Sequence, residues 1–122
     1  SFRFGKNITI KDGVVIDSNC CLWASKNSKI VIGEDTSIGQ NTIIISSNHS
    51  FHGKESYKKQ PMNEKDIIIE KNVWIGANSI ILSGVTIEEG AIIGAGSILT
   101  QDVPEFSIAL SRNRDIEYIE RV

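Results

Sequence analysis

The stretch from residue 67 to residue 99 reads IIIEKNVWIGANSIILSGVTIEEGAIIGAGSIL, and it repeats every six residues. Large aliphatic residues occupy every sixth position, at Ile69, Ile75, Ile81, Ile87, Ile93 and Leu99. A small or apolar residue stands two positions before each of them, so each unit carries two inward side chains that flank one outward side chain. This alternation is typical of a short β-strand. Polar or glycine-rich turns fill the intervals, so the stretch predicts short strands separated by tight turns.

A unit of six residues cannot bury its own apolar face, so it has to stack on copies of itself. The first half of the chain has the same period with one slip at Ser28-Lys29, and its aliphatic positions are Ile10, Ile16, Leu22, Ile32, Ile38 and Ile44. The pattern therefore predicts an all-β fold, a parallel β-helix, with one domain spanning residues 1–122. Three strands in each coil would give a triangular prism.

Composition excludes several classes of partner. The 122 residues carry 13 basic and 15 acidic side chains, for a net charge of −2, with no basic cluster. No apolar run approaches the length of about 18 residues that a membrane span needs, and no signal-peptide pattern opens the chain. We therefore expect no nucleic-acid partner and no membrane span.

The two cysteines, Cys20 and Cys21, are adjacent in the sequence. Neighbouring strand residues point to opposite faces, so a disulfide between them is geometrically poor. We expect Cys20 to be a small core residue and the protein to be cytoplasmic. The chain begins at Ser1 without Met and already within the repeat, so we expect a further N-terminal segment to precede it.

The six-residue count breaks between Ile44 and Ile67. The break predicts a protruding loop at about residues 50–66, and a tail is expected at about residues 105–122. The only two histidines of the chain, His49 and His52, stand at the start of the break. Continuing the count from Ile44 places His49 at an outward position on the prism wall, where a histidine is either a solvated surface residue or a functional group.

The outward positions of the second half are mostly apolar, and they are Trp74, Ile80, Thr86, Ile92 and Ile98. With three strands in each coil, residues 18 apart share a wall, so Trp74 should stack with Ile92, and Ile80 with Ile98. Exposed apolar columns normally mark an interface or a ligand groove. The pattern therefore predicts a self-associating prism with a cleft between its subunits.

Three segments carry a family resemblance: NVWIGAN at 72–78, SGVTI at 83–87 and IGAGSILTQDVP at 93–104. They resemble the hexapeptide-repeat acyltransferases, above all the maltose, galactoside and nodulation acetyltransferases and relatives that O-acetylate surface polysaccharides. The resemblance runs from Gly5 to about Pro104. It implies a left-handed β-helix, against the usual right-handed crossover rule, assembled as a homotrimer with an acetyl-CoA groove between neighbouring prisms.

The resemblance also implies roles for individual residues. His49 matches the catalytic base, with His52 and Asn48 as possible support. The residues matched to acetyl-CoA binding are Trp74 beside the pantetheine arm, backbone groups of Gly76, Ala77, Ala95 and Thr100, and Arg112 near the nucleotide phosphates. Asn19 falls near an acceptor-binding position, although an asparagine there is also a common turn former. The chain departs from the family pattern at Ser83, Gln101 and residues 111–114.

The implied function is transfer of an acetyl group from acetyl-CoA to a hydroxyl of a sugar or polysaccharide. His49 would act as general base, with no acyl-enzyme and no metal. Three alternatives remain open. An N-acetyltransferase acting on an amino sugar would use the same fold, and a non-catalytic trimeric scaffold would keep only the prism. A zinc hydratase of the γ-carbonic anhydrase kind needs three imidazoles, and this chain has two.

Overall fold

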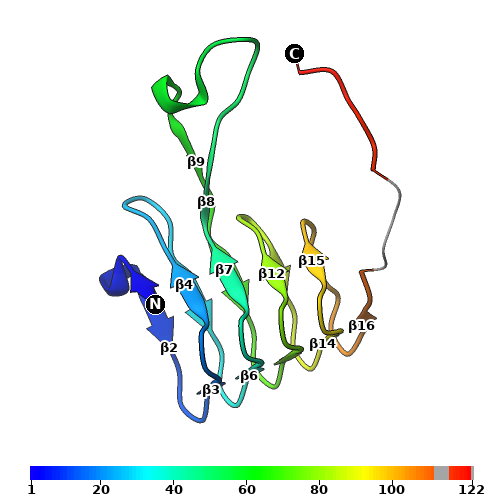
Figure 1. Cartoon of the computed structure of the whole chain (residues 1–122). Coiled ribbons are helices and arrows are strands. Elements are labelled where there is room, and N and C mark those ends of the chain that lie inside the picture. The colour runs from blue at the N-terminus through cyan, green and yellow to red at the C-terminus, as the bar shows by residue number, and fades with distance from the viewer. Residues whose placement is uncertain (112–115, 122) are drawn as a thin grey trace.

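The fold is a left-handed parallel β-helix with one arm projecting from it, as predicted (Figure 1). The computed structural model describes residues 1–111 and 116–121. Three parallel sheets, here called walls A, B and C, form the sides of a triangular prism. Each coil visits the three walls in turn, because residues 18 apart pair in parallel register where the six-residue count is unbroken.

The strands of the prism divide among the walls as follows. Wall A contains β1 (Phe2–Arg3), β4 (Cys21–Trp23), β7 (Ile43–Ile45), β12 (Ile80–Ile81) and β15 (Ile98–Leu99). Wall B contains β2 (Ile8–Ile10), β5 (Ile30–Ile32), β10 (Ile67–Ile69) and β13 (Thr86–Ile87). Wall C contains β3 (Val15–Ile16), β6 (Ser37–Ile38), β11 (Trp74–Ile75), β14 (Ile92–Ile93) and β16 (Ile108–Ala109).

The inward positions of the repeat form one continuous core. Every aliphatic position from Leu22 to Leu99 named in the sequence pattern is at most 7% exposed. In the first coil Ile10 is 40% exposed and Ile16 is half-buried, because a terminal coil has a neighbour on one side only. Cys20 is buried with a free thiol, as predicted. The core is therefore a stack of isoleucines closed by smaller residues at its corners.

The predicted outward columns are confirmed by the strand register. Trp74 pairs with Ile92 on wall C, and Ile80 pairs with Ile98 on wall A. Trp74 is 59% exposed and Ile98 is 54% exposed, so both columns present apolar surface. Exposed apolar columns of this kind are typical of an interface or a ligand groove.

The corner between walls C and A is built from residues with left-handed backbone. Asn19, Asn41, Asn78 and Gly96 have φ values of 61°, 62°, 59° and 74°, respectively, and lie one above another along that edge. Asparagine and glycine tolerate this conformation better than other residues. The φ of Asn19 confirms that it forms a turn, and its match to an acceptor-binding position stays a prediction.

The slip at Ser28-Lys29 and the break between Ile44 and Ile67 both fall at the corner between walls A and B. The first is a short loop at residues 24–29, closed by a bridge between Ser25 and Ser28. The second is the arm, residues 47–64, which follows β7 and returns to β10. The described residues also contain two 3-10 turns, η1 (Gly5–Asn7) and η2 (Tyr57–Lys59).

Two sequence-based boundaries differ from the structure. The protruding segment begins at Ser47 rather than at about residue 50, and its base is an antiparallel ladder of β8 (Ser47–His49) and β9 (Met62–Glu64). The tail begins later than residue 105, because β16 pairs with β14 and continues wall C to Ala109. In both cases strand pairing across the fold overrides the local loss of the six-residue pattern.

Candidate functional site

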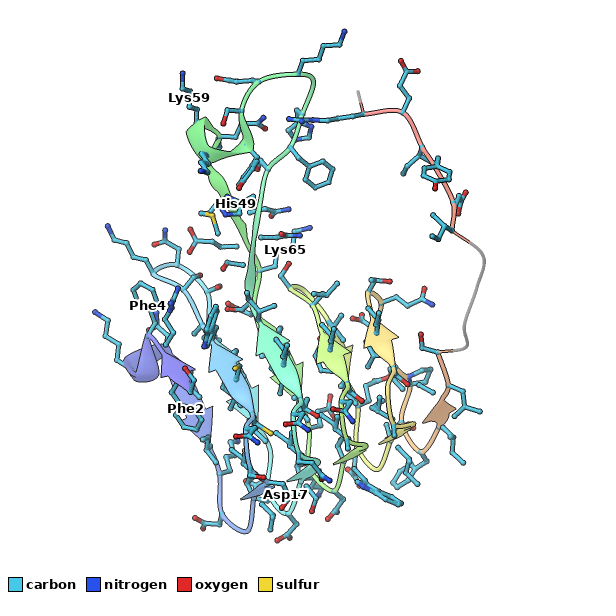
Figure 2. All side chains as sticks on the ribbon, in the orientation of Figure 1. Phe2, Phe4, Asp17, His49, Lys59 and Lys65 are labelled. Atoms are coloured by element: carbon cyan, nitrogen blue, oxygen red, sulfur yellow. The ribbon has the colours of Figure 1, made fainter. Side chains whose placement is uncertain are left out.

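His49 lies on the arm and not on the prism wall, which corrects the prediction from the six-residue count. In the β8–β9 ladder His49 is opposite Met62, and Ser47 is opposite Glu64. The count failed here because the chain leaves the prism after Ser46, so position 50 is no longer an inward position. Figure 2 shows His49 on the arm, higher in the view than Phe4 at the N-terminal end of the prism.

The base of the arm is fixed to the prism through Glu64. Its carboxylate accepts hydrogen bonds from Ser25 Oγ at 2.6 Å and from the Asn27 backbone N–H at 2.7 Å. These two bonds are the main causes that lower the pKa of Glu64. Ser28 Oγ, which contacts Ser25 Oγ, also donates to the Ser46 carbonyl at 2.9 Å, so the two corner breaks are bonded to each other. The arm therefore starts from a defined position.

The side chain of His49 is exposed, and its ring packs edge-on against Tyr57 with centroids 4.9 Å apart. The side chain of Asn48 accepts a hydrogen bond from the backbone N–H of His49 at 3.0 Å, which orients the strand around it. Within the described residues neither ring nitrogen of His49 has a hydrogen-bond partner. The imidazole is therefore available to a substrate.

The structure gives His52 a different environment. Its backbone N–H donates to Gln60 Oε1 at 2.8 Å, and its carbonyl accepts from Gln60 Nε2 at 3.1 Å. Its ring stacks on Phe51 with centroids 6.2 Å apart. Across residues 1–111 and 116–121, no hydrogen bond joins His52 to His49. His52 is thus part of the fold of the arm tip.

A cavity of about 380 Å³ lies between the arm and wall A. His49, Asn48 and Met62 line it from the arm, and the outward column Arg3, Trp23 and Ile45 lines it from the wall. The cavity thus joins a free imidazole to an aromatic and aliphatic surface. The sequence pattern does not mark Arg3, Trp23 or Glu64 as site residues. Alternation after Leu22 places Trp23 outward, but the other two depend on pairing between distant strands.

The residues matched to acetyl-CoA binding gather on another edge of the prism. Trp74 is exposed on wall C, and Gly76, Ala77 and Ala95 follow at the corner between walls C and A. In the described part of the chain the backbone N–H groups of Ala77 and Ala95 donate no hydrogen bond. Two unpaired donors beside an exposed indole suit the carbonyl groups and apolar chain of a pantetheine arm.

Thr100 lines a second cavity, of about 420 Å³, at the end of the prism. The rest of its lining comes from β15 of wall A, from β16 of wall C, from the segment between these strands and from the two residues after β16, Leu110 and Ser111. Arg112, matched to the nucleotide phosphates, lies outside the described residues. Gln101, where the family resemblance leads one to expect lysine, also lines this cavity.

The structure therefore brings the predicted site residues together in two groups, not one. His49 and Asn48 stand at the corner between walls A and B, whereas Trp74 stands on wall C of the same chain. A single prism cannot present both groups to one small substrate from one face.

Two further observations concern a metal site and a membrane span. In residues 1–111 and 116–121, no group of three or more His, Cys, Asp or Glu side chains is placed to hold a metal ion. No helix in that part of the chain is long and apolar enough to cross a membrane.

Comparison with known proteins gives a consistent result. Residues 66–101 match the family model described as bacterial transferase hexapeptide (six repeats). A galactoside O-acetyltransferase of Escherichia coli is 36% identical over 108 residues, which are 88% of this chain and 52% of that protein. This chain spans about half the length of the galactoside O-acetyltransferases it matches.

Two solved structures are similar over most of the chain. One is a hexapeptide-repeat acetyltransferase of Vibrio cholerae complexed with acetyl coenzyme A, at 33% identity and a TM-score of 0.80, covering 89% of this chain and 58% of that one. The other is a maltose O-acetyltransferase of Clostridium difficile, at 29% identity and a TM-score of 0.81, covering 98% of this chain and 64% of that one.

Proposed function

This chain belongs to the hexapeptide-repeat family of left-handed β-helix proteins, and we propose that it transfers an acetyl group from acetyl-CoA to a hydroxyl of a sugar or surface polysaccharide. The observation that carries the proposal is the free imidazole of His49 facing a cavity with an aromatic wall. The acetyl coenzyme A complex of the Vibrio relative supports the donor. The galactoside and maltose O-acetyltransferases among the relatives support a sugar hydroxyl as acceptor.

In this mechanism His49 removes the proton from the sugar hydroxyl as its oxygen attacks the acetyl carbonyl carbon. The carbon–sulfur bond of the thioester then breaks, and protonated His49 returns its proton to the CoA thiolate. An imidazole suits both steps because it gains and loses a proton near neutral pH. Direct transfer needs no acyl-enzyme, so neither free cysteine takes part.

Unpaired backbone donors are proposed to hold the acetyl-CoA. Trp74 would pack against the pantetheine arm, and the N–H groups of Ala77 and Ala95 would donate to its carbonyls. Thr100 and the cavity at the end of the prism would receive the distal part of the molecule. Arg112 is proposed as a phosphate ligand on the family resemblance alone. These residues bind and orient the donor, and the thioester supplies the reactive acetyl group.

A homotrimer is proposed because one chain leaves its two groups of site residues apart. Packing a neighbouring copy's Trp74 edge against the arm would bring a donor edge and an acceptor cavity into one cleft. The apolar columns on walls A and C supply surface that such packing would bury. We place the reaction in the cytoplasm, where acetyl-CoA is made and where Cys20 and Cys21 remain thiols.

Release of CoA thiol from acetyl-CoA, measured across a panel of sugars and oligosaccharides, tests the proposal. The variant His49→Ala should lower turnover by about 10²- to 10⁴-fold, or about 3–5 kcal/mol of transition-state stabilisation. Its melting temperature and assembly state should match those of the wild type, because His49 is exposed. His52→Ala is the matched control and should cost less, since its backbone and not its ring is bonded to Gln60.

Thiol release, combined with hydrolysis of the product, separates the O-acetyltransferase from the amino-sugar N-acetyltransferase and from the scaffold. A His49→Ala protein with near-normal transfer would reject the mechanism, and an unstable one would show that His49 is structural. Mild base releases acetate from an O-acetyl ester but not from an N-acetyl amide, so product hydrolysis distinguishes the amino-sugar alternative. A protein that still assembles but releases no CoA thiol with any acceptor in the panel would favour the non-catalytic scaffold.

A further inference from the structure

We propose that the acceptor is an acidic sugar, whose carboxylate is bound by Arg3 while His49 deprotonates one of its hydroxyls. The inference rests on the proposed function and adds the chemical class of the acceptor to it. Arg3 and His49 line the same cavity of about 380 Å³, one from wall A and one from the arm. That volume suits one or two sugar rings.

The guanidinium of Arg3 is held in place but not neutralised. It lies 4.1 Å over the ring of Trp23, its neighbour in the parallel register of β1 and β4. Within residues 1–111 and 116–121, no carboxylate forms a salt bridge with Arg3. Stacking on an aromatic face fixes the plane of a guanidinium and leaves its N–H edge for oxygen acceptors. A carboxylate fits that edge with two parallel hydrogen bonds.

Among the described residues, the carboxylate of Glu64 lines the cavity and already has hydrogen-bond partners. Glu64 accepts from Ser25 Oγ, from the Asn27 N–H and from Asn27 Nδ2 at 3.3 Å, all on the corner loop. Hydrogen bonds to the charged form lower its pKa, so it stays committed to this loop. Lys26 adds a second basic group to the lining. The charge of Lys26 acts on Glu64, whereas Arg3 has no acidic partner among the described residues. The guanidinium of Arg3 is therefore the cation that a neutral sugar would leave without a counter-charge.

Anchoring at Arg3 would also orient the acceptor. The column Arg3, Trp23 and Ile45 leads along wall A toward β7, from whose end the arm carrying His49 departs. A sugar held at its carboxylate would rest its apolar face on this column and direct a hydroxyl toward the arm. A substrate held at two points keeps its hydroxyl in a reactive orientation beside the base. Arg3 is thus assigned as a specificity-determining residue.

Matched glycoside pairs test the inference: p-nitrophenyl β-glucoside with β-glucuronide, and the galacto and manno equivalents. In at least one pair, kcat/KM for the acid should exceed that for the neutral sugar. Arg3→Gln should lower the acid-to-neutral ratio about 10- to 100-fold, the effect of losing a charge-assisted hydrogen-bonded pair. The acid-to-neutral ratio of Arg3→Lys should lie between those of the wild type and Arg3→Gln, because lysine keeps the charge but cannot form two parallel hydrogen bonds to a carboxylate. Lys6→Gln, at the same end of the prism but outside the cavity, should not change the ratio.

Direct binding of the same compounds, measured by calorimetry without acetyl-CoA, keeps this test separate from that of the proposed function. Transfer that prefers the neutral member of every pair, or a ratio unaffected by Arg3→Gln, would overturn the acidic acceptor while leaving the acetyltransferase intact. If no compound is acetylated, the proposed function fails, and binding of the acids that depends on Arg3 would still support the anion site. Preference for a 6-phosphate over the carboxylate in either assay would overturn the assignment of a sugar acid.

Discussion

Gly76, which follows Trp74 and Ile75, is predicted to tolerate an added side chain poorly. It lies at the corner between walls C and A, and its φ is not positive, so its requirement is for space and not for left-handed backbone. A Cβ added there would lie 2.6 Å from the backbone nitrogen of Ala95 and 2.8 Å from its Cα. These are backbone atoms of the next coil, which cannot move aside as a flexible side chain can.

The magnitude of the Gly76→Ala effect follows from that contact. A separation of 2.6 Å is about 0.8 Å shorter than ordinary van der Waals contact at 3.4 Å, so the two coils must part at this edge. Overpacking of this kind typically costs about 1–3 kcal/mol of unfolding free energy. For a domain of this size that corresponds to a fall in melting temperature of roughly 4–12 °C. The same movement displaces the Ala95 N–H, so the KM for acetyl-CoA should also rise.

Thermal unfolding followed by circular dichroism measures the first effect, and initial rates at varied acetyl-CoA measure the second. Gly5→Ala is the matched control, because its added Cβ meets nothing within 4 Å and its φ is not positive. It should change stability by less than about 0.5 kcal/mol. A Gly76→Ala protein that melts with the wild type would refute the argument from coil spacing. Equal losses in both variants would refute it too, since a general backbone effect would then explain them.

Two further predictions concern the assembly and the arm. Ile98→Asp should dissociate the proposed trimer, because it would place an unpaired charge in an apolar contact, whereas Thr9→Asp on wall B should leave the trimer intact. Sedimentation velocity measures the assembly state of both variants. An Ile98→Asp protein that still assembles would exclude the wall A column from the interface. The Glu64 carboxylate has a lowered pKa in the folded state, so its stabilising effect is complete above its ordinary value of 4.5 and is lost as the pH falls through the folded-state pKa. The difference in melting temperature between the wild type and Glu64→Gln should therefore shrink as the pH falls from 6 to 3, and a difference that stays constant over this range would show that the Glu64 charge does not anchor the arm.

The sequence by itself determined the prism. The six-residue period specifies which side chains point inward, and a stack of short parallel strands is the arrangement that buries them all. It also determined the outward columns, because Trp74 with Ile92 and Ile80 with Ile98 follow from the period multiplied by three walls. These features are local and repeated, so each unit restates the same information.

Only the tertiary structure decided where His49 lies and what surrounds it. The six-residue count placed His49 on a wall, but pairing of Ser47 with Glu64 lifts the chain away from the prism two residues earlier. The cavity joins residues from β1, β4 and the arm, and no local pattern links Arg3 to Trp23 or Glu64 to Ser25. Periodicity encodes contacts between equivalent positions of neighbouring coils. The site is built where the repeat is interrupted, so its geometry depends on long-range pairing and side-chain hydrogen bonds that appear only when the chain is folded.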